Sequence, residues 1–259
     1  MRIGFLGAGN MASAILRGMR DMEKGCYDIS EAAVRRAEQE LGARGFSSGE
    51  ALCAWADIVV LAVKPQVLEG AVRPLAGALA GKAVASIAAG WSLERLAALL
   101  PESRLCRVMP NTPAMVGAGM AAIAKETTFA PAEFDCIREV FSAIGRAVVV
   151  EERLFDAVTA VSGSGPAYLY MVIEAMADAG VREGLSRASA LELATQTALG
   201  SAKMVLESGL HPAALRDMVC SPGGTTIDAV CTLEEKGLRA AVESAVRVCA
   251  EKSRAMSKQ

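Results

Sequence analysis

The chain has 259 residues, which is enough for one large domain or two small ones. Hydrophobic residues make up 53% of it and aromatic residues only 4%, which indicates an aliphatic, alanine-rich core. The net charge is −2 at pH 7 and no long run of like charge is present, so we expect neither a nucleic acid nor a membrane as partner.

Cysteine and histidine usage argues against disulfides and metal. The seven cysteines are scattered and never form a C-x-x-C pair, so we expect small buried residues in a reducing cytosol. The single histidine, His211, cannot build a histidine-based site, and no metal is expected. The apolar start of the chain is interrupted by Asn10, and the apolar stretch Leu75–Ala89 contains Lys82 and is too short for a bilayer. We therefore expect a soluble, cytoplasmic protein.

The first predicted elements enclose a glycine-rich turn. A strand at Ile3–Leu6 leads through G-x-G-x-x-A into a helix at Met11–Met22. In this spacing Gly7 allows the tight turn, Gly9 allows close approach of the backbone, and Ala12 packs helix on strand. Free N–H groups and a helix N-terminus suit a pyrophosphate. The alternative is a strand-to-helix turn with no ligand.

Strands and helices alternate over the first 150 residues. The apolar run Asp57–Val63 is typical of a central parallel strand covered on both faces. The alternation predicts a doubly wound α/β sheet with a ligand crevice at the carboxyl ends of its strands. The predicted strands are Ile3–Leu6, Cys26–Ile29, Ala43–Phe46, Asp57–Val63, Ala83–Ala88, Arg104–Met109, Met120–Ala124 and Ala147–Val150. The predicted helices between them are Met11–Met22, Glu31–Leu41, Gly49–Trp55, Gln66–Leu79, Leu93–Leu100 and Ala132–Ile144, with caps at Ser30, Ser48 and Ser92.

The character of the chain changes after Glu152. From Arg153 to the end we predict no strand, only helices such as Pro166–Ala179 and Ser186–Ser208. The second of these is apolar around most of its girth and needs cover beyond one neighbour. We therefore divide the chain into a dinucleotide-binding domain, residues 1–152, and an all-α domain, residues 153–259, whose helices interleave with a second copy across a two-fold axis.

Several polar residues stand where the predicted elements end. Lys64 follows the central strand and either meets a phosphate or ribose or is simply solvated. Asn111, between two prolines, either faces a carboxamide or forms an Asx turn. Thr225 and Thr226 stand at the start of a helix predicted to span Thr226–Glu235; they either cap it, which the sequence favours, or turn toward a substrate.

Asp28 is the acidic residue expected about twenty positions after the glycine turn. A carboxylate there accepts hydrogen bonds from a ribose 2′-hydroxyl and repels a 2′-phosphate, which favours NAD. However, the second strand is short, and Arg35 and Arg36 are close enough in sequence to compensate a phosphate. The choice between NAD and NADP stays open.

Five segments together resemble the pyrroline-5-carboxylate reductase family over the whole chain: Gly7–Ala12, Ala62–Pro65, Val108–Pro113, Ser162–Tyr168 and above all Leu215–Val230. The resemblance implies reduction of 1-pyrroline-5-carboxylate by NADH or NADPH, the last step of proline synthesis. It also implies a Rossmann domain, a helical dimerisation domain, and homodimers that can assemble into a ring, a decamer of dimers.

The resemblance also assigns residues. Cofactor contacts fall on Leu6, Gly7, Ala8, Gly9, Asn10, Met11, Ala62, Val63, Lys64, Pro65, Ala88, Ala89 and Asn111, to which the position of Asp28 adds a ribose contact. The substrate residues are Glu152, Ser164, Gly224, Thr225 and Thr226, with Thr226 the catalytic candidate. Two departures, the short second strand and Asp28 where many members carry Asn, Ser or a basic residue, bear on cofactor preference.

The residue inventory agrees with imine chemistry. Reduction of a ketone usually needs a positioned acid, and no histidine lies in a plausible catalytic loop, whereas a basic cyclic imine arrives largely protonated. Two alternatives are a β-hydroxyacid dehydrogenase with Lys203 as its catalytic lysine and a non-catalytic dinucleotide sensor.

Overall fold

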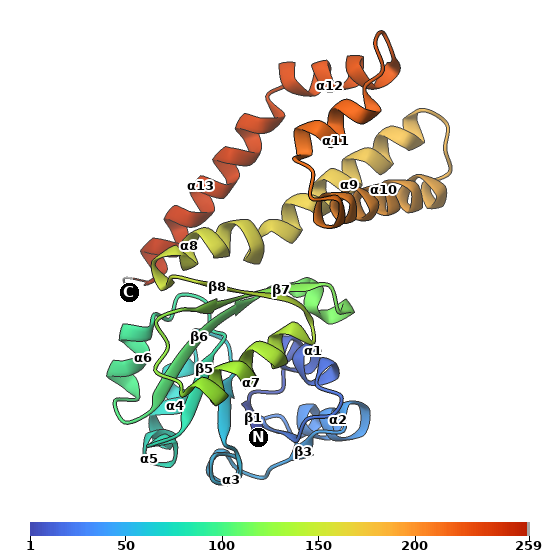
Figure 1. The fold of residues 1–259 in the computed structure, drawn as a ribbon. Coiled ribbons are helices and arrows are strands. Elements are labelled where there is room, and N and C mark those ends of the chain that lie inside the picture. The colour runs from blue at the N-terminus through green and yellow to red at the C-terminus, as the bar shows by residue number, and fades with distance from the viewer. Residues whose placement is uncertain (258–259) are drawn as a thin grey trace. The chain divides into compact units, whose positions relative to one another are not determined.

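The structure is a computed structural model that describes residues 1–257. The chain divides into two units, which Figure 1 traces in chain order. Unit 1 comprises Met1–Ser164 together with Cys249–Gln259, and unit 2 comprises Gly165–Val248. The domain boundary at residues 152 and 153 stays a prediction, and residues 258 and 259 of the predicted second domain lie outside the described residues.

An eight-stranded sheet runs through unit 1 in the order β3-β2-β1-β4-β5-β6-β7-β8. The pairings from β3 to β6 are parallel, β7 is antiparallel to β6, and β8 is parallel to β7. The predicted doubly wound sheet is confirmed, with one antiparallel junction that the alternation did not indicate. The strands are β1 (Ile3–Leu6), β2 (Lys24–Tyr27), β3 (Arg44–Gly45), β4 (Ile58–Leu61), β5 (Ala83–Ser86), β6 (Arg104–Pro110), β7 (Gly119–Ala124) and β8 (Gly145–Val150).

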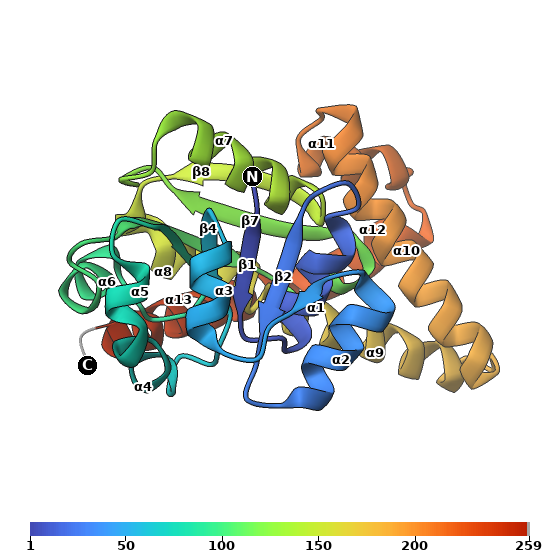
Figure 2. The same ribbon diagram turned by 90° about the horizontal axis from the view of Figure 1, so that it is seen from below.

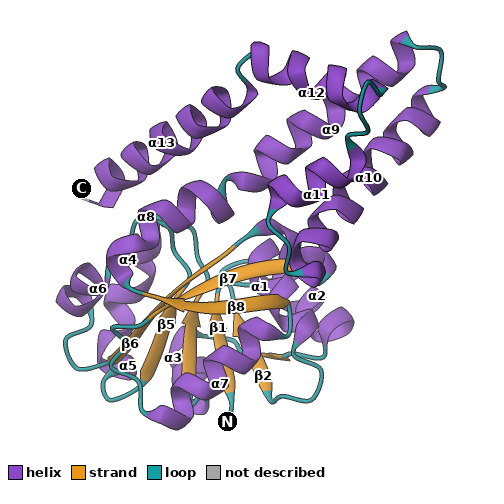
Figure 3. Ribbon diagram, turned by 45° about the horizontal axis from the view of Figure 1, so that its top comes forward, coloured by secondary structure: helices purple, strands orange, loops and turns teal. Residues whose placement is uncertain are grey.

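Helices cover both faces of the sheet (Figures 2 and 3). Side chains of α1, α2 and α7 pack with Ile3, Phe5 and Val60 on one face. Side chains of α3 to α6 pack with Val59 and Leu61 on the other. The helices of unit 1 are α1 (Asn10–Gly18), α2 (Glu31–Leu41), α3 (Gly49–Trp55), α4 (Leu68–Val72), η1 (Arg73–Leu75), α5 (Ala76–Leu79), α6 (Leu93–Leu99), η2 (Thr112–Val116), α7 (Pro131–Ser142), η3 (Glu152–Leu154), α8 (Phe155–Val158) and the π-helical segment η4 (Thr159–Gly163).

The predicted serine caps are confirmed. The hydroxyls of Ser30, Ser48 and Ser92 accept hydrogen bonds from backbone N–H groups in the first turns of α2, α3 and α6. Each satisfies a donor that the first helical turn would otherwise leave unpaired. These caps fix where three helices begin after the loops that leave the sheet.

Several boundaries were predicted wrongly. Helix α1 ends at Gly18 rather than Met22. The helix expected at Gln66–Leu79 is divided into α4, η1 and α5, because Pro74 lacks an N–H and clashes with the preceding turn. The second strand ends at Tyr27 rather than Ile29, and Ile29 is 94% exposed. The third strand shrinks from Ala43–Phe46 to Arg44–Gly45, at the edge of the sheet.

Unit 2 is helical throughout, which confirms the all-α prediction (Figure 3). Its buried hydrophobic cluster consists of Ala177, Ala190 and Ala194, where α9 packs on α10. Large apolar side chains stay exposed, among them Met171 at 70%, Leu206 at 62% and Met218 at 68%. The helices are α9 (Gly165–Arg182), α10 (Arg187–Ser208), α11 (Pro212–Val219), α12 (Thr225–Glu235) and α13 (Leu238–Ser257), which runs on into unit 1.

The cysteines follow the prediction in part. Cys26, Cys53 and Cys106 are buried in unit 1, but Cys231 on α12 is exposed, so burial is not general. Burial raises the pKa of Cys26 to about 11 and that of Cys106 to about 12. These thiols are therefore protonated and unreactive at neutral pH. Within residues 1–257, no helix is long and apolar enough to cross a membrane.

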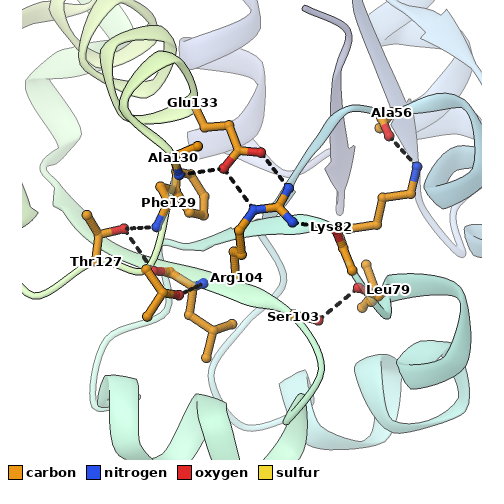
Figure 4. A network of polar contacts seen from close by, with 12 residues as sticks. Ala56, Leu79, Lys82, Ser103, Arg104, Thr127, Phe129, Ala130 and Glu133 are labelled. Carbon is orange, nitrogen blue, oxygen red and sulfur yellow. Dashed lines mark hydrogen bonds and ion pairs between the residues drawn. The ribbon is translucent and has the colours of Figure 1, made fainter.

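A polar network fastens α7 to the sheet (Figure 4). The Arg104 guanidinium on β6 forms an ion pair with Glu133 on α7, with Nε donating to Oε2 at 3.0 Å. Glu133 Oε2 also accepts the Ala130 N–H at 2.8 Å, which caps α7. The hydrogen bond from Arg104 is the main cause of a pKa of Glu133 below its ordinary value of 4.5.

We expect Glu133 to make the unfolding free energy sensitive to acid. A carboxylate with a lowered folded pKa stabilises the fold above its unfolded pKa, and this stabilisation is lost as the pH falls through the folded pKa. Glu133→Gln should therefore flatten the decline in stability below pH 4.5, the ordinary value for Glu133, in denaturant titrations. Glu139→Gln, an exposed position on the same helix, is the control; an equal pH slope in both variants would contradict the assignment.

Candidate functional site

The turn between β1 and α1 depends on glycine at position 7. Gly7 has φ +106°, a left-handed conformation that side chains rarely adopt. A Cβ there would lie 2.8 Å from the carbonyl carbon and oxygen of Ala62, which follows β4. The Gly7 N–H donates to the Tyr27 carbonyl at 2.8 Å. The turn is therefore wedged between the carboxyl ends of β2 and β4, where the strand order reverses.

Gly9 leaves space beside the start of α1. It is the N-cap of α1, makes no side-chain cap, and a Cβ built on it would meet nothing within 4 Å. The first N–H groups of α1 thus lack a capping side chain and carry the positive end of the helix dipole. An open backbone at this position fits a pyrophosphate group.

Two further loops with predicted cofactor contacts lie beside this turn. The Ala62 N–H donates to the Leu6 carbonyl at 2.8 Å, and the Ile87 N–H donates to the Leu61 carbonyl at 3.2 Å. The segments Ala62–Pro65 and Ala88–Ala89 therefore follow adjacent strands, and Lys64 in the first segment is exposed. The structure brings the predicted segments after β1, β4 and β5 together at one edge of the sheet.

Ser86 shapes the third of these loops and was not predicted from the sequence. Its side chain is fully buried at the end of β5, and its hydroxyl accepts the Ala88 N–H at 3.3 Å. The Trp91 indole donates to the Pro65 carbonyl at 3.1 Å, which ties this loop to the one after β4. The sequence does contain a signal for Ser86, because a polar residue stands at the end of an otherwise apolar strand.

Asp28 joins the end of β2 to the glycine turn. Its Oδ2 accepts the Ala8 N–H at 2.8 Å, and its Oδ1 accepts the Ser30 N–H at 2.9 Å. The second bond turns the chain away from the sheet, which explains why β2 ends before Ile29. The Arg36 guanidinium approaches the Ala8 carbonyl at 3.5 Å. The predicted ribose residue is therefore also part of the scaffold of the turn.

Asn111 clamps two segments of unit 1 and does not form an Asx turn. Its Nδ2 donates to the Ser162 carbonyl at 3.1 Å and to the Ser162 hydroxyl at 3.3 Å. Its Oδ1 accepts the Met120 N–H at 2.8 Å. Both amide hydrogens are thus directed at Ser162 on the π-helical segment η4, a type of segment that is frequent at functional sites. The role of Asn111 beside a nicotinamide stays a prediction.

Glu152 is held in a partly buried ion pair. Its Oε1 accepts from Arg107 at 3.0 Å and from the Leu93 N–H at 2.6 Å, at the start of α6. Arg107 is 6% exposed, and its guanidinium lies over the Phe155 ring, 4.5 Å from the centroid. Arg107 was not predicted as a site residue, although a charge inside an otherwise apolar strand was a signal for it. The contact of Glu152 with substrate stays a prediction.

Ser164 ends unit 1 beside the last helix. The Cys249 thiol on α13 donates to the Ser164 hydroxyl, with 3.2 Å between Sγ and Oγ. One turn further along α13, the Ser253 hydroxyl donates to Asp156 at 2.6 Å. The end of α13 therefore packs beside η4 and holds Ser164 in place.

The remaining predicted substrate residues belong to unit 2. Helix α12 starts at Thr225, one residue earlier than predicted, with Gly224 as its N-cap and no capping side chain. Capping by Thr225 or Thr226, which the sequence favoured, is therefore wrong. Both threonines lie in the first turn of α12, where no capping side chain accepts a hydrogen bond from the backbone N–H groups.

The single histidine does cap a helix, because His211 Nδ1 accepts the Ala213 N–H at 3.2 Å at the start of α11. This contact gives the imidazole a structural role at the surface of unit 2. In the described part of the chain, no group of three or more His, Cys, Asp or Glu side chains could hold a metal ion.

A doubly wound sheet with an open glycine turn at its switch point defines a dinucleotide-binding oxidoreductase fold. Comparison with known proteins makes the class specific. Residues 152–256 match the family model "Pyrroline-5-carboxylate reductase dimerisation", and residues 2–90 match "NADP oxidoreductase coenzyme F420-dependent".

Full-length relatives agree. The chain is 44% identical over 266 residues to pyrroline-5-carboxylate reductase of Methanosarcina acetivorans, covering 100% of this chain and 98% of that one. A solved pyrroline-5-carboxylate reductase from Coxiella burnetii superposes with a TM-score of 0.93 at 31% identity, covering 100% and 99% of the two chains. The Plasmodium falciparum enzyme with NADP bound gives a TM-score of 0.88 at 32% identity, covering 99% and 98%. The chain belongs to the pyrroline-5-carboxylate reductase family.

The clamp around Asn111 gives a stability prediction. Asn111→Ala removes the acceptor of the Met120 N–H and one donor to the Ser162 carbonyl, and should cost about 1–3 kcal/mol in the free energy of unfolding. Ser162→Ala removes one hydroxyl contact and should cost about 0.5–1 kcal/mol. Denaturant unfolding of both variants and of the double variant measures their coupling; purely additive effects would contradict the clamp.

Proposed function

We propose that this protein reduces 1-pyrroline-5-carboxylate to L-proline by hydride transfer from NADH or NADPH, as the last step of proline biosynthesis. Membership of the reductase family over the full length carries the proposal. The glycine turn adds an independent physical reason, since Gly9 leaves open space at the uncapped start of α1.

The chemistry asks for positioning more than for acid catalysis. When bound, the reduced nicotinamide supplies the hydride. The cyclic imine is protonated at nitrogen before reduction, so hydride addition to its carbon yields the neutral ring amine without a proton from the enzyme. What the chain must do is bind the carboxylate, hydrogen-bond the ring nitrogen and hold both partners in line, which can lower a barrier by several kcal/mol.

The cofactor residues that we propose follow the carboxyl edge of the sheet. The turn from Leu6 to Met11 holds the pyrophosphate through the N–H groups of Gly9 to Met11, because those of Gly7 and Ala8 already donate to the Tyr27 carbonyl and to Asp28. Ala62 to Pro65 and Ala88–Ala89 form the walls of the crevice. Asp28 contacts the adenosine ribose. Asn111 acts on the nicotinamide side through the segment that it clamps, since its amide hydrogens are directed at Ser162.

The substrate residues that we propose are Glu152, Ser164, Gly224, Thr225 and Thr226. Gly224, Thr225 and Thr226 provide N–H groups and hydroxyls at the dipole-positive start of α12, which suits a carboxylate. Ser164 contributes a hydroxyl that Cys249 orients. Thr226 is the catalytic candidate. Glu152 lies near the substrate while paired to Arg107, so its charge is partly neutralised by that partner.

The alternative enzyme class has weaker support. A β-hydroxyacid dehydrogenase needs a catalytic lysine, but Lys203 stands on α10 with a side chain 66% exposed and Glu207 Oε1 3.8 Å away. That is an ordinary surface pair of low energy. A dinucleotide sensor would not need a polar glycine loop at the start of α12. Oxidation of NADH or NADPH with the imine acid, and no reduction of NAD or NADP with 3-hydroxy acids, tests the choice.

Thr226→Ala is the variant that tests the catalytic assignment. Loss of a hydroxyl that bonds a charged substrate should lower kcat/KM by about 10- to 100-fold, with NADH and NADPH affinity little changed. Thr226→Ser should restore most of the activity. Thr232→Ala, on the same helix with its hydroxyl bonded to the Asp228 carbonyl, is the control. Wild-type turnover in Thr226→Ala would remove Thr226 from the mechanism.

The chain self-associates, as its match to a dimerisation model indicates. We propose specifically a homodimer with interleaved helices, which can assemble into a ring, a decamer of dimers. Unit 2 supports this because its own cluster contains three alanines while Met171, Leu206 and Met218 are exposed. Apolar surface of that extent marks an interaction site.

Light scattering on the purified full chain at micromolar concentration should give at least twice the monomer mass of 26.9 kDa. Leu206→Asp, which places a charge on the exposed face of α10, should lower that mass, while Glu192→Gln on the same helix should not. A monomer in the wild-type sample would refute the interleaved arrangement.

We also propose a cytoplasmic location, with no nucleic acid or membrane as partner. The scattered cysteines, which form no C-x-x-C pair, suit a reducing compartment.

A further inference from the structure

We propose that Asp28 makes this enzyme prefer NADH over NADPH. The inference rests on the proposed function, since it concerns the cofactor of that reaction. It goes further because family membership leaves the choice between the two cofactors open.

The position of the Asp28 carboxylate is fixed. Both oxygens accept backbone N–H groups, from Ala8 at 2.8 Å and from Ser30 at 2.9 Å. A carboxylate oxygen has two lone pairs, so each oxygen keeps one acceptor position. Because the residue is only half-buried, these positions are open to a ligand at the glycine turn. A preorganised pair of acceptors loses little entropy on binding.

The two cofactors differ in what they present to such a group. The adenosine ribose of NADH carries a 2′-hydroxyl, which can donate to a carboxylate oxygen. NADPH carries a 2′-phosphate at that position, which has a charge of about −1.5 to −2 at pH 7 and mainly acceptor oxygens. Beside Asp28 the phosphate meets a like charge and loses the donor that the carboxylate requires.

The neighbouring arginines do not reverse this balance. Arg35 forms an ion pair with Glu31 at 3.3 Å, so part of its charge is compensated on α2. Arg36 approaches the Ala8 carbonyl at 3.5 Å, while Asp28 binds the N–H of the same residue at 2.8 Å. The Asp28 carboxylate is thus held closer to the turn than the Arg36 guanidinium is. Removing the Asp28 carboxylate leaves the Arg36 guanidinium beside the Ala8 carbonyl, where it can attract a phosphate.

The decisive experiment measures binding as well as activity. Calorimetry on the wild-type full chain compares ADP-ribose with 2′-phospho-ADP-ribose, and steady-state kinetics compares NADH with NADPH. We expect ADP-ribose to bind at least about tenfold more tightly, and kcat/KM to favour NADH by a similar factor. Equal affinities, or tighter binding of the phosphorylated ligand, would overturn the proposal whatever the variants do.

Variants then assign the preference to Asp28. Asp28→Ser should reduce the discrimination at least about tenfold, and Arg36→Met in that background should remove the gain for the phosphorylated ligand. Glu40→Gln, an exposed acidic position on α2, is the charge-matched control. Unchanged discrimination in Asp28→Ser, with a melting temperature close to wild type, would overturn the role of Asp28. If Asp28→Ser does not fold, Asp28→Asn takes its place under the same criterion.

The outcomes separate the two proposals. Discrimination between the ADP-ribose ligands without turnover of the imine acid would refute the reductase activity and leave the role of Asp28 intact. Turnover of the imine acid with a preference for NADPH would support the reductase activity and refute the role of Asp28.

Discussion

The close approach of the backbone at Gly7 to the end of β4 is the constraint on which the cofactor edge depends. A side chain at position 7 would collide with the carbonyl group of Ala62 at 2.8 Å and would have to adopt φ +106°. Only glycine satisfies both demands. Because the turn can close against β4, α1 starts directly over the sheet, and Gly9 is presented with open space beside it. The fold thus leaves the uncapped N–H groups at the start of α1 with open space beside them.

Polar side chains at this edge act first on the protein's own backbone. Asp28 accepts the N–H of Ala8, Asn111 binds Ser162 and the N–H of Met120, and Glu152 accepts the N–H of Leu93. Each was predicted from sequence as a ligand contact. Hydrogen bonds to backbone fix a side chain in one rotamer and fix the loop that it bonds, so a ligand meets a site that is already ordered. Asp28 keeps acceptor positions for a ligand, whereas the amide hydrogens of Asn111 are already directed at Ser162.

Local patterns explain how much could be predicted from the sequence. The central strands were predicted from apolar runs, because a strand buried on both faces must be apolar, as β4 is. The serine caps were predicted correctly because a cap joins a serine hydroxyl to the backbone N–H only three residues later, which is a local pattern. The Arg107–Glu152 pair joins positions far apart in the chain, and no local rule indicates such a partner. The π-helical segment η4 likewise depends on Asn111 and on the end of α13, which packs beside it. The end of β2 was misplaced because the side chain of Asp28, rather than strand propensity, sets it.

The division of labour between the two units follows from the same physics. Unit 1 buries its apolar residues on both faces of a sheet and has a complete core. Unit 2 has a small alanine cluster of its own and leaves large apolar side chains exposed. In the homodimer that we propose, helices of the two copies cover these apolar faces. In the function that we propose, the substrate carboxylate binds at the start of α12. An imine substrate suits such a site, because alignment of two bound ligands, rather than a strongly perturbed acid, is what the assembled loops have to provide.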